Sequence, residues 1–230
     1  MKFRRKNRPD EPAAEPDPAG PAEPTRPTGS TGSAQPVEEP EPADEAAVSI
    51  DGPFDIDEVD VPEDIYVDLG SVLIQPFEDS ELRMQVEESS GDVLAVLLIN
   101  EEGALEVRAF AAPRNGDLWS DARREIAADA ARRGGTADER TGPFGSELFC
   151  QVPVTTDEGE AAVQPSRVIG CNGPRWFLRA TLLGRPAVEP ESAALWEDTI
   201  RAIVVRRGKD PVPPGEALPL AVPDNAQRVE

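Results

Sequence analysis

The sequence predicts an α+β fold in which two helices pack on an antiparallel sheet of about six to seven strands, in the order strands, helix, strands, helix. Three observations support this prediction. Short runs typical of strands follow one another through residues 81–111, with polar turns between them. A helical period replaces this pattern at residues 117–133, and strand-like runs then return. A second helical period begins near residue 190.

The first strands are expected to form an antiparallel meander. ELRMQVEE (81–88) and ALEVRAF (104–110) alternate apolar and polar residues, which is typical of half-buried strands. Between them, VLAVLLIN (93–100) is almost continuously apolar and suits a strand covered on both sides. Because the SSGD and NEEG turns are short, neighbouring strands should pair as hairpins. Upstream, IYVDLGSVLI (65–74) is predicted to be a first strand.

The first helix is predicted over residues 118–133. Asp117 is a suitable N-cap, and Gly134 with Gly135 ends the helix. Trp119 is expected to fill the seam between the helix start and the sheet. The face that packs on the sheet consists of Leu118, Ala122, Ile126 and Ala130.

The second group of strands follows this helix. Residues 136–142 are a polar strand or loop, GPFG is a turn, and ELFCQVPV (147–154) is a strand. Residues 155–165 are expected to be a loop. Two further strands then meet at Asn172-Gly173, a strong hairpin dipeptide. In the second of them, the residues expected in the core are Trp176, Leu178, Ala180 and Leu182.

The second helix is predicted to begin near Pro190 and to end at Gly208. Its buried face consists of Ala193, Trp196, Ile200 and Ile203. Charged residues on its other faces, including Glu197, are expected to face solvent.

The composition divides the chain into four parts. Residues 1–47 are a basic tip followed by an acidic arm rich in Pro, Ala and Glu, with too little apolar surface to fold, and are predicted to be disordered. Residues 48–80 are a transitional strap with the possible first strand. Residues 81–208 form a single α+β domain. Residues 209–230 are an extended Pro-rich tail whose LPLAV segment can attach to the domain.

The net charge of −22 is unevenly distributed. Residues 9–80 hold 20 acidic residues and a single basic residue, whereas residues 81–208 hold 21 acidic and 15 basic residues. The domain is therefore only mildly acidic. It would oppose nucleic acid unless its basic side chains form a coherent patch.

The composition excludes several kinds of site. The chain has no His, so it has no Ser-His-Asp triad and no His-based metal site. Its two cysteines, Cys150 and Cys171, lie in apolar strand-like runs and are expected to be buried, reduced thiols. Acidic residues at 55, 57 and 60 lack the Gly and terminal Glu of an EF-hand loop. We therefore expect no metal, no cofactor, no transmembrane segment and a cytoplasmic location.

The candidate binding surface is one face of the strand after Gly173. Arg175 and Arg179 should project from the same face with Phe177 between them, as a contact for an anion or a nucleic acid. Arg167 on the paired strand could join them across the hairpin, and Arg185 lies nearby. The alternative interpretation is a solvated face whose arginines form ion pairs with carboxylates such as Glu147.

Three functions follow, in decreasing order of support. The first is a non-catalytic interaction or adaptor module with an unknown protein partner, and the second is binding of an anion or a nucleic acid by the arginine face. The third is a carboxylate-based hydrolase or transferase. It is the least favoured because nothing in the spacing of the candidate acids selects a pair. Those acids are Asp138, Glu139, Glu147 and Asp198.

Five segments within about residues 50–220 form a distinctive set of motifs: GPFGSEL, NGPRWFLRATLLGRPAV, AFAAPRNGDLW, GGTADE and PPGEALPL. With these motifs the sequence resembles an actinobacterial family of unknown function, domain of unknown function 3710. The family is uncharacterised, so the resemblance supplies no catalytic residues. The order of strands and helices also resembles that of the PsbP-like α/β sandwich, which implies no activity.

Overall fold

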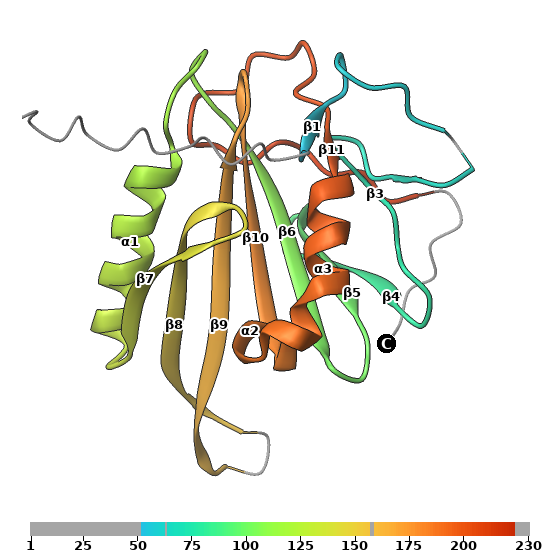
Figure 1. The fold of residues 1–230 in the computed structure, drawn as a ribbon. Coiled ribbons are helices and arrows are strands. Elements are labelled where there is room, and N and C mark those ends of the chain that lie inside the picture. The colour runs from blue at the N-terminus through green and yellow to red at the C-terminus, as the bar shows by residue number, and fades with distance from the viewer. Residues whose placement is uncertain (1–51, 63, 157–158, 224–230) are drawn as a thin grey trace, which may run out of the picture. The chain divides into compact units, whose positions relative to one another are not determined.

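The computed structural model describes residues 52–62, 64–156 and 159–223. The larger sheet in this part of the chain has seven antiparallel strands in the spatial order β4-β5-β6-β10-β9-β8-β7 (Figure 1). In chain order they are β4 (Glu81–Val86), β5 (Val93–Ile99), β6 (Gly103–Ala111), β7 (Thr136–Gly142), β8 (Gly145–Thr155), β9 (Ala161–Asn172) and β10 (Trp176–Gly184). The predicted α+β class and antiparallel sheet are confirmed.

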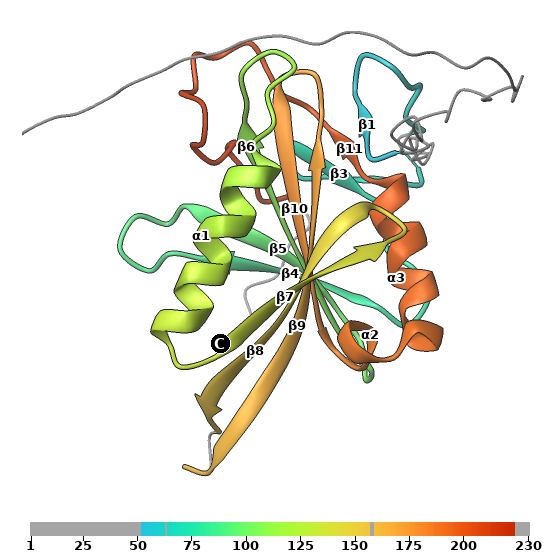
Figure 2. The ribbon, with the colours of Figure 1, turned by 60° about the vertical axis from the view of Figure 1, so that its left-hand side comes forward.

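Two further layers lie on the sheet. One face carries α1 (Trp119–Arg132), and we call it the α1 face. The opposite face, the α3 face, carries α2 (Arg185–Val188), α3 (Pro190–Ala202) and a smaller sheet. Figure 2 shows α1 and α3 on opposite sides of the strands. The smaller sheet has the order β1-β11-β3-β2 and consists of β1 (Phe54–Asp55), β2 (Val67–Asp68), β3 (Val72–Ile74) and β11 (Val204–Val205).

Antiparallel pairing decides which side chains enter the main core. Trp176 pairs with Ala111, Leu178 with Ala109 and Leu182 with Leu105 across β10 and β6. Directly paired residues share a face of the sheet, so one alternating set is buried on the α3 face. The predicted core positions of β10 are confirmed, and all of them are at most 2% exposed.

The start of α1 receives hydrogen bonds from two side chains that are far apart in the sequence, Asp117 and Asn172. The prediction of Asp117 as the N-cap residue is wrong by one position, because Leu118 is the N-cap, but the Asp117 carboxylate still accepts the backbone N–H of Ser120. Asn172, from the end of β9, accepts the N–H groups of Leu118 and Trp119 and donates to Asp117. Trp119 fills the seam as predicted, because Gly170 beneath its ring has no side chain. These contacts attach the start of α1 to the hairpin formed by β9 and β10.

The predicted end of the second helix is wrong. The α3 helix ends at Ala202, and Ile203 is already extended, with φ −60° and ψ 136°. The β-branched residues that follow prefer a strand, and β11 is held between β1 and β3 by parallel and antiparallel pairing. The short helix α2 was also missed, since a single turn beginning with Arg185-Pro186 has no helical period to detect.

Two other predicted boundaries are corrected. The run at residues 65–74 is a hairpin of β2 and β3 rather than one strand, because Gly70 adopts φ +82° and turns the chain. The predicted loop at 155–165 is partly strand, since β9 begins at Ala161 and pairs with Thr155. The polar residues 136–142, left open between strand and loop, form β7.

Residues outside the large sheet pack against its buried side chains and complete the hydrophobic core. Leu69, Val72 and Ile74 are completely buried among residues of β5, β6 and β10, so residues before 81 share one core with the domain. The predicted attachment of LPLAV is confirmed, because Leu218 is 3% exposed and donates its N–H to Ala109. The predicted disordered arm, 1–47, lies outside the described residues. No helix among the described residues is long and apolar enough to cross a membrane.

The strap that contains β1 is tied to the sheet by one buried hydrogen bond. The indole Nε1–H of Trp176, 2% exposed, donates to the carboxylate of Asp55 at 2.8 Å. Replacing Asp55 by Ala leaves this buried donor without a partner, so we expect Asp55→Ala to lower the free energy of unfolding by about 1–3 kcal/mol. Urea denaturation measures the change. Asp57→Ala, at an exposed position of the same strap, is the control, and equal losses in the two variants would contradict the assignment.

Both cysteines are buried and unpaired, as predicted. Burial, and secondarily the charge of Glu147, raises the pKa of Cys171 to about 12. An unfolded thiol loses its proton near its ordinary pKa of 9.0, so the free energy of unfolding should fall as the pH rises from about 9 towards 12.

We expect iodoacetamide at pH 8 to modify neither cysteine in the native protein and both in denaturant, as measured by mass spectrometry. Cys171→Ala should reduce the alkaline loss of stability. Native and denatured chains that reacted at similar rates would contradict the burial of the thiols.

Candidate binding surface

The pairing of β6 with β10 brings two arginines opposite each other on the α1 face. Arg179 pairs directly with Arg108, and the next pair on this face is Phe177 with Phe110. Both strands alternate, and their other residues enter the main core, so this arginine pair, Arg108 and Arg179, points away from it.

The arginine pair rests on a row of stacked aromatic rings. The Phe110 and Phe177 centroids are 5.8 Å apart, and those of Phe177 and Trp119 are 6.0 Å apart. The guanidinium carbons of Arg108 and Arg179 lie 5.5 Å and 5.7 Å from the Phe110 centroid. These cation–π contacts hold both guanidiniums over one ring.

The charges of this pair are not balanced. Arg179 is 3.2 Å from the Glu106 carboxylate, whereas Arg108 forms no ion pair and no side-chain hydrogen bond with any described residue. Burial, and then repulsion from Arg179, lowers the pKa of Arg108 despite the opposing effect of Glu106. The Nε atoms of both arginines are buried without a partner among the described residues. Among the described residues, the two guanidiniums of the pair thus share one carboxylate, that of Glu106.

The structure brings together only part of the predicted surface. Phe177 does lie beside Arg179, but it is 4% exposed within the aromatic row and offers no open ring. Arg175 is exposed and precedes β10, where its carbonyl accepts the Ala112 N–H. Arg185 lies in α2, paired with Glu102 and Glu189.

The expectation that Arg167 joins Arg179 is wrong. Arg167 pairs with Leu182, whereas Arg179 pairs with Gly170, so the two arginines occupy opposite faces of the sheet. Arg108 and Phe110 were missed. The alternation of residues 104–110 could have indicated them, because Leu105, Val107 and Ala109 face inward.

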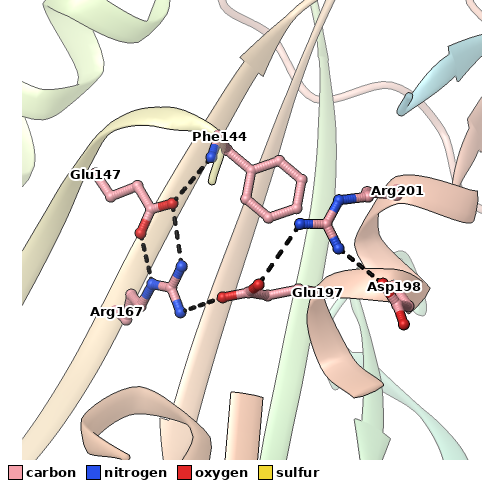
Figure 3. A network of polar contacts seen from close by, with 6 residues as sticks. All are labelled: Phe144, Glu147, Arg167, Glu197, Asp198 and Arg201. Atoms are coloured by element: carbon pink, nitrogen blue, oxygen red, sulfur yellow. Dashed lines mark hydrogen bonds and ion pairs between the residues drawn. The ribbon is translucent and has the colours of Figure 1, made fainter. Parts of the chain in front are cut away.

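On the α3 face, Arg167 lies at the centre of a buried ionic network (Figure 3). Its guanidinium donates to both carboxylate oxygens of Glu147 and to Glu197 of α3. Glu147 also accepts the backbone N–H of Phe144, and Arg201 lies 3.6 Å from Glu197. The side chain of Glu197 is only 13% exposed, so the expectation that it faces solvent is wrong.

This network is a structural clamp, defined as Glu147, Arg167 and Glu197. Burial by itself would lower the pKa of Arg167, but hydrogen bonds and charge attraction from the two carboxylates raise it above its ordinary value. The arginine therefore remains charged and joins β8, β9 and α3. Beside the clamp lies a cavity of about 350 Å³ between the β7–β8 turn and the α2–α3 segment.

Removing the centre of the clamp should be strongly destabilising. Arg167→Ala leaves the Glu147 side chain, 4% exposed, as an unpaired buried charge, and we expect a loss of about 3–5 kcal/mol in urea denaturation. The double variant Glu147→Leu/Arg167→Met should recover a large part, since both charges are removed. A double variant less stable than Arg167→Ala would contradict the clamp.

The remaining acidic residues in the described part of the chain do not assemble a metal centre. Among residues 52–62, 64–156 and 159–223, no group of three or more carboxylates and thiols is arranged to hold a metal ion. Asp55, one of the acids in the EF-hand-like run, is engaged by Trp176. A cavity of about 500 Å³ near the start of α1 is lined by Glu58 and Asp117, and Asp117 is already engaged in capping.

Comparison with known proteins identifies a family without a known activity. A family model described as protein of unknown function (DUF3710) matches residues 52–229. No curated protein matches the chain. The match includes the two sheets, the three helices and both arginines of the pair, and it covers most of the sequence. The chain belongs to the DUF3710 family of proteins of unknown function.

Proposed function

We propose that this protein is a non-catalytic interaction module that recognises an anionic group of a protein partner with Arg108 and Arg179. The observation that carries the proposal is their direct cross-strand pairing, in which Glu106 is the one described carboxylate that forms an ion pair with either arginine. Like charges directly opposite each other destabilise a sheet. A carboxylate placed between the two guanidiniums would remove this repulsion and satisfy Arg108, in charge-assisted hydrogen bonds.

The candidate acids for catalysis are largely engaged elsewhere. Glu147 is held by Arg167, Glu139 lies 3.0 Å from Arg123, and Asp198 lies 2.7 Å from Arg201. These ion pairs leave no free pair of carboxylates facing each other among these residues. Binding is therefore better supported than hydrolysis or group transfer.

Nucleic acid is a second candidate ligand for the arginine pair. The net charge of −22 opposes approach of a long polyanion, whereas a short acidic segment interacts mainly within a Debye length of about 8 Å. This difference favours a protein partner.

The proposal includes an adaptor role for the full chain and a cytoplasmic location, for which the two free thiols provide support. The element order further supports a PsbP-like sandwich, which implies no activity.

Relief of repulsion can be measured without a ligand. Arg108→Met keeps an apolar side chain against Phe110 and removes one of the two opposed charges, so we expect the free energy of unfolding to rise by about 0.5 kcal/mol. Arg83→Met is the matched control, because Arg83 lies on the same face but is paired with Glu81. Its stability should stay constant or fall. A loss of stability in Arg108→Met would show that Arg108 is compensated within the chain.

Anion recognition can be tested by titration with succinate at constant ionic strength, observing the arginine Nε–H signals by NMR. We expect saturable shifts for Arg108 and Arg179 and none for Arg124, an exposed arginine of α1 paired with Asp121. Arg179→Met should abolish the shift of Arg108. Equal shifts of all arginines would indicate general screening and contradict the proposal.

A further inference from the structure

We infer that the partner binds as an amphipathic acidic helix that lies beside α1 and covers β10, β6 and β5. The inference rests on the proposed function, since the acidic residues of this helix would be the groups that the arginine pair recognises. It adds the shape of the partner and a second, apolar contact.

The α1 face is covered over only part of its width. The α1 helix packs over β7, β8 and β9, and its first residue, Trp119, reaches Phe177 of β10. Among the described residues, no other helix lies on this face, whereas α2, α3 and the smaller sheet cover the opposite one (Figure 2). The four strands that α1 does not pack over are β10, β6, β5 and β4. At about 4.8 Å spacing they span roughly 15–19 Å, which is wider than a helix of about 10–12 Å. The uncovered part has room for one more helix.

The uncovered part continues from the arginine pair into an apolar patch. This patch consists of four partly exposed side chains, Leu97, Ile99, Ala104 and Leu183. Pairing places them together, because Ala104 lies opposite Ile99 on one side and opposite Leu183 on the other. A partner that touched only the arginines would leave this patch in water. The complementary surface is therefore acidic opposite the arginine pair and apolar opposite the patch, with Glu106 and Thr181 of the sheet between the two.

The spacing of these groups matches a helix that runs along the strands. Ala104 lies four residues before Arg108 in β6 and Leu183 four residues after Arg179 in β10, about 13 Å along the strands, and Leu97 lies level with Glu106, halfway between. In a helix, residues at i, i+4 and i+8 share a face and are separated by about 6 and 12 Å. One face can therefore present an acidic residue to the arginine pair and leucines to the apolar patch.

Two other modes of binding are less compatible with the molecule. The edge strands β4 and β7 carry charged side chains, such as Arg83 and Glu139. Such charges discourage a partner from adding a strand of its own to the edge of the sheet. A second copy of this chain docked by a two-fold axis through the arginine pair would bring four guanidiniums together. A helix of opposite charge avoids both obstacles.

The experiment compares two blocked peptides of about 16 residues with one composition of Glu, Leu, Ala and Gln. In one peptide Glu and Leu occupy a single helical face at i, i+4 and i+8, and in the other the order is scrambled. Fluorescence anisotropy with the full chain gives Kd, and circular dichroism follows peptide helicity. We expect the amphipathic peptide to bind at least tenfold more tightly than the scrambled one and to become helical on binding.

Variants of the chain separate the two contacts. Arg108→Met/Arg179→Met should weaken both peptides, whereas Leu97→Asn/Leu183→Asn should weaken only the amphipathic one. Arg124→Met and Leu195→Asn, at exposed positions of α1 and α3, are the matched controls and should change neither Kd. Near-ultraviolet circular dichroism verifies that each variant remains folded.

The outcomes distinguish this inference from the proposed function. If both peptides bind equally, or neither binds while succinate still shifts Arg108 and Arg179, the helical partner is wrong and anion recognition stands. If succinate also fails to shift the signals of Arg108 and Arg179, the proposed anion recognition is wrong as well. Tighter, arginine-dependent binding of a single-stranded oligonucleotide than of the amphipathic peptide would overturn the helix in favour of nucleic acid.

Discussion

The register of β10 between β6 and β9 is the constraint on which the rest of the structure depends. Because side chains alternate along a strand, a shift of one residue would exchange the two faces of the sheet. The observed register buries Trp176 on the α3 face, where its indole holds Asp55 of the strap. It also aligns Arg179 with Arg108 and places Gly170 beneath Trp119. The main core, the attachment of the strap, the position of α1 and the candidate surface thus all depend on the register of β10.

The buried and half-buried arginines on the two faces of the sheet differ in how far carboxylates neutralise them. On the α3 face, Arg167 is surrounded by carboxylates of Glu147 and Glu197, so the cost of burying it is offset and the network joins separate elements (Figure 3). On the α1 face, Arg108 is half-buried beside Arg179 and forms no ion pair with any carboxylate in the described part of the chain. Compensated charges are typical of a structural role. Repulsion within the arginine pair lowers the stability of the isolated chain, and the proposed partner would relieve it.

Much of the fold was predictable because strong local periods survive tertiary packing. The alternation in β4, β6 and β10 and the helical period of α1 identify these elements, and the Gly134 stop agrees with the observed end near Arg132. Elements with weak local sequence patterns were not predicted correctly. Val204 and Val205 continue a helical period in the sequence, but pairing with β1 and β3 makes them a strand. Short strands such as β1 exist only because partners distant in sequence supply their hydrogen bonds.

The sequence by itself determined the α+β class, the absence of His chemistry, the burial of both cysteines and the inward face of β10. These follow from composition and from periods of two and 3.6 residues, which need no knowledge of distant neighbours. Only the tertiary structure decided that Arg108 faces Arg179, that Arg167 lies on the other side and that Glu197 turns inward to Arg167 rather than to solvent. Strand pairing joins residues about 70 positions apart, such as Arg108 and Arg179, and its register depends on the packing of the whole core rather than on either strand alone.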